Sequence, residues 1–338
     1  MSEEQACLLM KNSLVIDGLI ASSLNENLVK HIISSGYTVG NYTCGSSADD
    51  TTQAMFKMEA VRWLVDYIPD NIFIVENFKD IEKAKEQGKF GVIMGFQGAE
   101  PIGNKFHMLS IFWRLGLRIL GLTYSQRNLL GDGCLEPENR GLSHFGIQVV
   151  RDCNNLGIVV DLSHTSIRTS MDAIELSEKP CIFSHSNPAT LQKNPRNVTD
   201  EQMKKIAKRE GVVCLAAFSD FVGNTKNGRH PKIEELIRQI DYTVNLIGID
   251  HVGVGTDILI GGGGHWWNNN TKRRYPETTG GMSYDRHEIV DFQDFSGFTK
   301  TVTQLLERGY VEEDIKKIIG GNLYRVFQEV LPRQGGKI

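Results

Sequence analysis

The chain has 338 residues and a formal net charge of −4, with 40 % apolar and 23 % charged residues. This balance is ordinary for a soluble globular protein and gives no general attraction to nucleic acid. No apolar run approaches the roughly 20 residues of a membrane-spanning helix, so we expect no membrane partner. The six cysteines form no C-x-x-C pair, and the acidic N-terminus lacks a signal-peptide core, so we expect a cytoplasmic protein.

Short apolar segments alternate with amphipathic ones along the whole chain. The segments predicted as strands are 14–20, 38–43, 91–98, 118–124, 157–164, 180–186, 211–218 and 251–258. They are continuous apolar runs, which are typical of a parallel sheet covered on both faces. Amphipathic stretches with helical spacing lie between them. The pattern predicts a single α/β domain over residues 1–338, a (β/α)8 TIM barrel.

Two intervals depart from a simple strand–helix alternation. The interval 44–90 is long, and we expect it to hold an extra short strand (NIFIVEN) and a second helix (KDIEKAKEQG). The segment 261–286 follows the eighth strand and begins with four glycines, which cannot hold a helix. A loop of this length is usually functional or disordered. Trp266 and Trp267, beside His265, could form an aromatic lid, although packing is the simpler role.

Polar side chains stand at the carboxyl ends of several predicted strands, where a barrel places its catalytic groups. These residues are Gln97, Tyr124, His164, His185 and Asp257. His164 and His185 end consecutive strands, so their imidazoles should lie close enough to share a metal ion. The alternative is that each is a hydrogen-bonded core histidine.

Asp257 and Arg196 add two charged groups to this end of the barrel. Asp257 could bind metal or act as a general base, or it could simply cap the next loop. Arg196, on the loop after the sixth predicted strand, could hold a substrate carboxylate through paired hydrogen bonds. Its alternative is an ordinary surface arginine.

Four motifs resemble the membrane (renal) dipeptidase family of metallopeptidases. They are DLSHTS around His164, FSHSNPATLQKNPRNVTDEQM from Phe183, HVGVGTD ending at Asp257, and GGNLYRVFQEV near the C-terminus. The resemblance runs from about Leu14 to Val330. It implies an amidohydrolase-type barrel, a homodimer, and two zinc ions joined by a bridging hydroxide.

The resemblance also implies roles for individual residues. His164 and His185 match the histidines that bind the second metal ion. Asp257 matches a carboxylate that binds the first metal ion and transfers a proton. Arg196 matches the arginine that receives the substrate carboxylate.

Other positions depart from the family pattern. Leu19 and Ala21 stand where the family carries a metal-binding His-x-Asp pair, directly after Asp17-Gly18. Gln97 falls at the metal-bridging glutamate, and Tyr124 at a substrate-contacting histidine. We therefore do not expect a binuclear centre, because a divalent ion needs anionic ligands in a dry site.

These observations predict a dipeptidase-like metallohydrolase that cleaves an amide or other C–N bond of a small, amino-acid-like substrate. One divalent ion, most simply zinc, would be bound by His164, His185 and Asp257, with Arg196, Tyr124 and Gln97 facing the substrate. Glu100 or His265 could replace the lost ligands. Asp17 is expected to satisfy backbone groups beneath the site. Two alternatives stay open: an inactive binding or sensor protein, and a metal-free lyase or isomerase.

Overall fold

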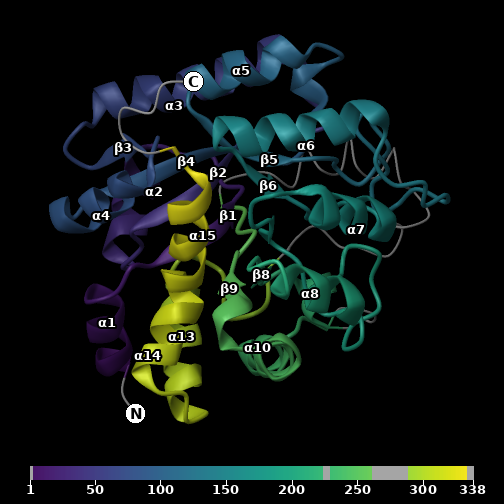
Figure 1. Ribbon diagram of the computed structural model, residues 1–338. Helices are drawn as coiled ribbons and strands as arrows, with labels where there is room; N and C mark the ends of the chain where they lie inside the picture. Colours follow the sequence, from purple (N-terminus) through teal and green to yellow (C-terminus); the bar gives the residue numbers. More distant parts are fainter. Residues whose placement is uncertain (1–2, 224–228, 261–287, 333–338) are drawn as a thin grey trace.

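Parallel strands follow one another around a nearly closed barrel in the computed structural model, which describes residues 3–223, 229–260 and 288–332 (Figure 1). The strands are β1 Ile16–Ile20, β2 Val39–Gly45, β4 Phe90–Phe96, β5 Leu117–Gly121, β6 Val159–Asp161, β7 Ile182–Phe183, β8 Val212–Leu215 and β9 Val252–Val254. Neighbours in this order pair in parallel. A parallel bridge between Ile20 and Ile258 joins the first strand to the last. The predicted barrel is confirmed.

The long interval between β2 and β4 contains the two extra elements that the sequence predicts. β3 (Ile72–Ile74) pairs in parallel with the first half of β4. α4 (Phe78–Gln87) follows β3 and ends at Gly88, whose φ of 63° suits glycine. This insertion extends the sheet beside β4 without interrupting the barrel order.

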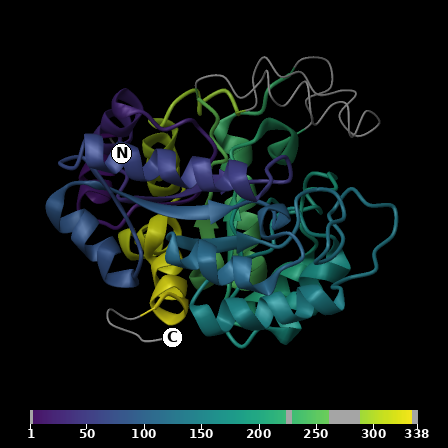
Figure 2. The same ribbon diagram turned by 90° about the horizontal axis from the view of Figure 1, so that it is seen from above.

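Helices surround the strands, as the two views show (Figures 1 and 2). The helices are α1 Glu3–Lys11, α2 Glu26–Ser34, α3 Thr51–Tyr67, α5 Phe106–Arg114, α6 His144–Leu156, α7 Ile167–Leu176, α8 Asp200–Ala207, α9 Ser219–Val222, α10 Ile233–Ile247, α13 Gly297–Glu307, α14 Glu312–Lys316 and α15 Asn322–Val330. Short helical turns are η1 Glu100–Ile102, η3 Ile249–His251 and η4 Lys317–Gly321. α1 packs against α13, so the N-terminal helix lies beside a helix from the last quarter of the chain.

Local side-chain hydrogen bonds set where several helices begin. Ser143, Ser166 and Thr199 accept hydrogen bonds from main-chain N–H groups in the first turns of α6, α7 and α8. Such caps are typically worth about 1 kcal/mol each. These helices each follow a loop of the barrel's carboxyl end, so the caps also set where those loops stop.

Alternate strand residues bury into two different apolar clusters, because successive side chains point to opposite faces of a sheet. Val159 packs in one cluster with Ile182 and with Phe327 of α15. Its neighbours Ile158 and Val160 pack in the other, larger cluster. Each fully buried aliphatic side chain contributes roughly 1.5–3 kcal/mol to folding. Both faces of the sheet are therefore apolar, which explains the continuous hydrophobic runs in the sequence.

Several strands, among them those that precede the site residues, end earlier than predicted. β6 ends at Asp161 rather than His164, and β9 ends at Val254 rather than Asp257. The backbones of His164 and Asp257 adopt positive φ values of 70° and 56°, which a strand cannot continue through. His164 and Asp257 thus lie just past the hydrogen-bonded ends of β6 and β9, in the first turns of the loops that follow.

No helix within the described ranges combines the length and the apolar character needed to cross a bilayer.

Candidate active site

The residues predicted to carry chemistry follow directly after neighbouring strands of the barrel. Among the described residues, three that are not glycine have positive φ, and two of these are His164 and Asp257. A left-handed backbone at a non-glycine residue is costly and is often found at functional sites. The fold therefore holds both side chains in a conformation that local preference alone would not select.

His164 and His185 face each other through their Nε2 atoms, which lie 3.0 Å apart. The rings meet edge to face, with centroids 5.0 Å apart. Burial lowers the pKa of both imidazoles well below the usual range, and the nearby charge of Arg196 lowers it further. The two rings, called here the histidine pair, are therefore neutral at physiological pH, and one nitrogen must donate to the other.

The outer nitrogens of the histidine pair contact serine hydroxyls. Ser125 Oγ lies 3.0 Å from His164 Nδ1, and Ser184 Oγ lies 2.6 Å from His185 Nδ1. Ser184 in turn donates to Oδ2 of Asp161 at 2.5 Å. Ser125, Ser184 and Asp161 were not predicted from the sequence as site residues. Their signal was adjacency, since each lies within three residues of a predicted strand-end histidine or tyrosine.

A close backbone approach fixes the start of the loop that carries His185. A Cβ atom at Gly255, just after β9, would lie 1.8 Å from the main-chain oxygen of Ser184. Only glycine permits this contact between the end of β7 and the end of β9. Ser184 and His185 are also completely buried. Their positions therefore depend on packing across the barrel rather than on their own loop.

Tyr124 lies flat against the ring of His164, with centroids 4.0 Å apart and an interplanar angle of 24°. The loop after β5 that carries Tyr124 is joined to the loop after β6. The Cys134 N–H donates to the His164 carbonyl at 2.7 Å, and the Ser166 N–H donates to the Asp132 carbonyl at 2.9 Å. These main-chain hydrogen bonds connect the segment that carries His164 to the loop between β5 and α6.

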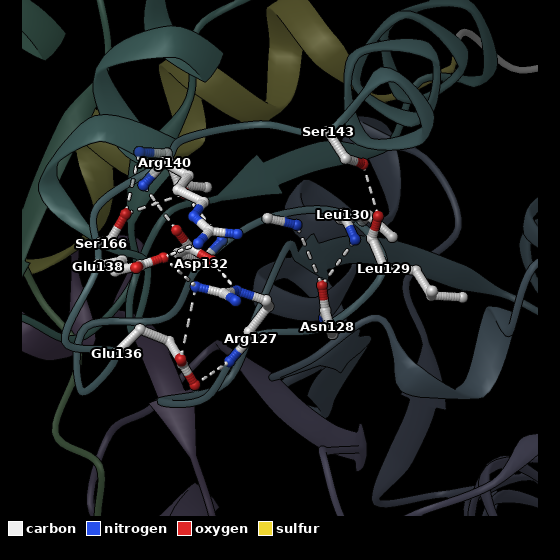
Figure 3. A network of polar contacts seen from close by, with 12 residues as sticks. Arg127, Asn128, Leu129, Leu130, Asp132, Glu136, Glu138, Arg140, Ser143 and Ser166 are labelled. Atoms are coloured by element: carbon white, nitrogen blue, oxygen red, sulfur yellow. Dashed lines mark hydrogen bonds and ion pairs between the residues drawn. The ribbon is translucent and has the colours of Figure 1, made fainter.

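A network of charged side chains braces this loop (Figure 3). Arg127 lies at its centre and donates to Asp132 at 2.5 Å, with Glu136 and Glu138 each at 3.8 Å. Asp132 is almost fully buried and also accepts the main-chain N–H of Arg140 at 2.7 Å. The network folds the loop back on itself and leaves Tyr124 and Ser125 directed at His164.

Arg196 is a buried cation that forms no close ion pair among the described residues. Its side chain donates from Nη2 to the His185 carbonyl at 3.1 Å and lies over the ring of Phe221, with Cζ 5.0 Å from the centroid. Its Nε atom is buried and has no hydrogen-bond partner in the part of the chain that the structure describes. Arg196 forms no ion pair with any residue in the ranges that the structure describes. A buried, unpaired charge is strongly unfavourable, so the arrangement suits an anionic ligand.

Asp257 lies within electrostatic reach of the same groups. Burial raises the pKa of its carboxyl to about 7, against the opposing effect of Arg196, and Glu288 and Asp17 raise it further. The charge of Asp257 also helps to raise the pKa of Tyr124, although burial of that phenol has the larger effect. Asp257 can therefore exchange a proton near neutral pH, as a general base must.

The β1 and β4 side of the barrel end is built differently. Leu19 is buried, Ala21 is partly exposed, and Gln97 donates from Nε2 to Thr43 Oγ1 at 2.8 Å. Asp17 accepts the main-chain N–H of Leu19 at 3.0 Å. It also accepts the N–H and the hydroxyl of Thr256 at 2.8 and 2.6 Å. Asp17 satisfies backbone groups beneath the site, as expected from the sequence.

The donor set was tested against the metal centre that the sequence resemblance implies. Two zinc-bound nitrogens at 2.0–2.1 Å and tetrahedral angles lie roughly 3.3 Å apart, so the histidine pair suits one shared ion. Within residues 3–223, 229–260 and 288–332, no three His, Cys, Asp or Glu side chains gather closely enough to hold a metal. Among the described residues, the donor set thus contains two imidazoles placed for one ion, and the absence of a binuclear centre stays a prediction. The structure does not bring Asp257 into a three-ligand group, so its role as a ligand stays a prediction.

Some predicted groups are not tested by this geometry. The loop 261–286, with His265 and both tryptophans, lies outside the described residues. Glu100 begins η1, close to Gly98, where a Cβ atom would lie 2.5 Å from its Oε2. The replacement of a lost ligand by Glu100 stays a prediction.

A closed parallel barrel with imidazole, carboxyl and guanidinium groups at its carboxyl end defines an amidohydrolase-type (β/α)8 protein. The sequence model of the family described as membrane dipeptidase, Peptidase family M19, matches residues 20–280 and 277–334. The chain therefore belongs to this family of metallopeptidases, as the sequence motifs predicted.

Curated relatives include two fungal dipeptidases. Dipeptidase tcpJ of Claviceps purpurea is 29 % identical over 287 residues, which cover 84 % of this chain and 61 % of that protein. Dipeptidase aclJ of Aspergillus oryzae is 27 % identical over 278 residues, which cover 81 % of this chain and 60 % of that protein. The matched region thus spans about three fifths of these two relatives.

Solved structures confirm the fold over nearly the whole chain. An amidohydrolase from Pseudomonas aeruginosa is 32 % identical with a TM-score of 0.89, covering 98 % of this chain and 99 % of that one. A metallopeptidase from Rhodobacter sphaeroides, solved with a phosphinate mimic of L-Ala-D-Ala, is 21 % identical with a TM-score of 0.78. That match covers 94 % of this chain and 99 % of that chain, and it supports the fold alone.

Proposed function

We propose that this protein hydrolyses the amide or another C–N bond of a small, amino-acid-like substrate that carries a free carboxylate. The observation that carries the proposal is the buried guanidinium of Arg196, which has an unpartnered Nε and forms no ion pair among the described residues. Membership of a dipeptidase family supports the reaction class. The buried positive charge of Arg196 supports the proposal that the substrate carries a negatively charged carboxylate.

Arg196 is suited to bind the carboxylate end of such a substrate. A guanidinium offers planar, paired N–H donors that match a carboxylate, and such bonds are stronger when buried. Phe221 packs against the guanidinium and the His185 carbonyl accepts one of its protons, so its orientation is already set. A preset donor loses little side-chain freedom when the ligand arrives.

Asp257 is suited to hold and move the reacting proton. Its carboxyl has a pKa of about 7, because burial disfavours the charged form more than Arg196 favours it. A base near neutral pH can take a proton from the attacking water and pass it to the leaving nitrogen. Tyr124 packs flat on His164 at the same end of the barrel.

The histidine pair would hold a single divalent ion. When bound there, such an ion supplies Lewis acidity toward the carbonyl group and lowers the pKa of water near it. A reduced, mononuclear site is part of the proposal, since Leu19, Ala21 and Gln97 offer no anionic ligand on the opposite side.

The test is a matched substrate panel assayed with purified protein of known metal content. Dipeptides and N-acyl amino acids are compared with the same compounds carrying a C-terminal amide in place of the carboxylate. We expect turnover of a free-carboxylate substrate, a loss of at least about 100-fold with its amide, and abolition by His185→Ala. Equal turnover of acid and amide forms would remove the role of Arg196. No turnover by a metal-loaded protein across the panel would refute the hydrolase proposal.

A metal-free acid–base enzyme, a lyase or an isomerase, is the second candidate. The direct Nε2–Nε2 contact of 3.0 Å favours it, because the paired nitrogens can pass a proton between themselves. The two candidates differ in one measurement. Chelation followed by gel filtration abolishes activity in the first and leaves it intact in the second, whereas His185→Ala abolishes both.

A further inference from the structure

Five side chains form one continuous chain of hydrogen bonds through the site, and we call it the relay. Its members, in order, are Asp161, Ser184, His185, His164 and Ser125. The successive distances are 2.5 Å, 2.6 Å, 3.0 Å and 3.0 Å. All five side chains are at least nine-tenths buried, so water does not interrupt the sequence of bonds.

The Asp161 end sets the direction of the relay. Oδ1 of Asp161 accepts the main-chain N–H groups of Ser163 and Ser184, both at 3.0 Å. Its Oδ2 accepts the hydroxyl proton of Ser184. A serine hydroxyl has only one proton to donate. Since that proton points to Asp161, the Ser184 oxygen must accept the proton of His185 Nδ1.

The direction then passes through both imidazoles. A neutral imidazole carries one proton, so His185 with its proton on Nδ1 has a bare Nε2. The 3.0 Å contact between the rings is then donated by the Nε2–H of His164. His164 Nδ1 is bare in turn and accepts the hydroxyl proton of Ser125.

The two ends of the relay differ in rigidity. Ser184 is held by Asp161, and its oxygen also lies 3.3 Å from Ser163 Oγ, so its hydroxyl cannot reverse without breaking a charge-assisted bond. The hydroxyl of Ser125 has no such carboxylate and can either donate to Nδ1 of His164 or accept from it.

We propose that Asp161 and Ser184 are positioning residues that hold His185 as the Nδ1–H tautomer, whereas His164 can move its proton between its two nitrogens. The inference concerns the site of the proposed function, but it does not depend on any substrate. It assigns unequal roles to two histidines that the sequence presents as equivalent.

The asymmetry has a consequence for cation binding and for acid–base chemistry. His185 presents a lone pair at Nε2 in every state. His164 offers a second lone pair, also at Nε2, only when its proton moves to Nδ1 and the Ser125 hydroxyl turns to accept it. A single tautomer change thus converts a hydrogen-bonded pair into a two-nitrogen ligand set, and outer-shell partners of this kind commonly tune metal affinity 10–100-fold.

The sharpest test is Asp161→Asn, which keeps the shape of the side chain and reverses the bond to Ser184. The asparagine Oδ1 still accepts both main-chain N–H groups, but its NH₂ now donates to the Ser184 oxygen. Ser184 must then donate to His185 Nδ1, and the His185 proton moves to Nε2. The corresponding exchange in serine-protease triads preserves geometry and produces the wrong tautomer.

The tautomers are read by long-range ¹H–¹⁵N NMR on histidine-labelled protein without added metal, with signals assigned by His185→Gln. We expect the His185 proton on Nδ1 in the parent and on Nε2 in Asp161→Asn, with a mixture in Ser184→Ala. Ser125→Ala is the matched control, which changes the signals of His164 and leaves the His185 tautomer unchanged. A parent His185 protonated on Nε2, or no change in a folded Asp161→Asn, would overturn the inference.

A zinc-binding isotherm gives a second readout. We expect Asp161→Asn to weaken binding of zinc alone by about 10–100-fold, with a smaller effect of Ser125→Ala. If the variant fails to fold, the parent spectrum and Ser184→Ala still decide the tautomer. If the tautomers behave as expected but no C–N bond is cleaved, the proposed function fails and the positioning role stands.

Discussion

The two sides of the barrel's carboxyl end contrast in their chemistry. On the β6–β7 side, His164 and His185 are buried, hydrogen-bonded at both ring nitrogens, and supported by a carboxylate one residue further out. On the β1–β4 side, Leu19 and Ala21 have no polar side chain, and Gln97 donates to Thr43. One side holds a preorganised pair of imidazoles, while Gln97 and Asp17 on the other side are hydrogen-bonded to neighbouring threonines.

The contrast teaches that the two sides of one barrel end can be built from different chemistry on the same fold. The strands, glycine contacts and loop bracing that place His185 are packing features, and they do not depend on what occupies the opposite side. Near β1 and β4, Gln97 donates to Thr43, and Asp17 accepts from Thr256.

The largest effect is expected from adding metal-binding side chains to the β1–β4 side, so that both sides of the barrel end carry them. Leu19→His, Ala21→Asp and Gln97→Glu together add one imidazole and two carboxylates opposite the histidine pair. We expect tightly bound zinc, measured by elemental analysis, to rise from at most one ion per chain to two. Leu19→His alone is the control and should bind no second ion. A folded triple variant with unchanged zinc content would show that the assignment at β1 is wrong.

The next effect concerns the buried cation Arg196, which donates to the His185 carbonyl. Arg196→Leu removes the proposed carboxylate anchor, and loss of a buried charged pair costs about 2–5 kcal/mol. We expect KM for a free-carboxylate substrate to rise about 100-fold, with a smaller change in kcat. Arg140→Leu, at a largely exposed arginine of the loop after β5, serves as the control and should leave KM unchanged. Equal effects of the two variants would contradict the role of Arg196.

A smaller effect is expected in the pH dependence of stability, through Asp17 beneath the β1 side. Burial raises the pKa of Asp17 from 3.8 to about 7. Between these values the folded protein binds a proton that the unfolded chain has released, so stability falls as pH rises and levels off above the folded pKa. The expected slope is about 1.4 kcal/mol per pH unit.

Asp17→Asn removes this slope. In denaturant unfolding at pH 5 and at pH 8, we expect the stability of the variant relative to the parent to improve by on the order of 2–3 kcal/mol at the higher pH. An identical pH dependence in the two proteins would show that Asp17 does not titrate in this window.

The smallest effect is expected in the loop that braces the β6–β7 side. Arg127→Gln removes the centre of the network in Figure 3. Because the Arg127 side chain is 40 % exposed, we expect thermal unfolding to report a loss of only about 0.5–1 kcal/mol. Arg168→Gln, at an exposed pair within α7, should cost about 0.3 kcal/mol and is the comparison. A loss above about 3 kcal/mol would mean that the loop is part of the folding core.

Most of the architecture was accessible from local pattern. Continuous apolar runs predicted the strands from β1 to β9, and the interval 44–90 yielded both β3 and α4 as expected. The ends of the strands were less accessible, since β6 and β9 stop before His164 and Asp257. The pattern of apolar residues indicates which segments are buried, but it does not show where the backbone leaves the strand. The positive φ values of His164 and Asp257, just past the strand ends, cannot be predicted from hydrophobicity.

The site was accessible only in part. His164, His185, Arg196 and Asp257 could be named because chemically distinctive residues at strand ends stand out in an apolar sequence. Ser125, Ser184 and Asp161 could not, because serine and aspartate are common near loops, and the contacts of Ser184 with Asp161 and of Ser125 with His164 span 23 and 39 positions.

The amino-acid order alone established a parallel barrel, the family motifs and the residue types at each strand end, because these depend on short-range pattern. The folded chain alone established that the two histidines touch, that Arg196 is buried without an anion among the described residues, and that Asp161 orients His185 through Ser184. Hydrogen-bond direction, burial and electrostatic reach depend on which distant segments meet. Those meetings follow from packing around the barrel rather than from any one stretch of sequence.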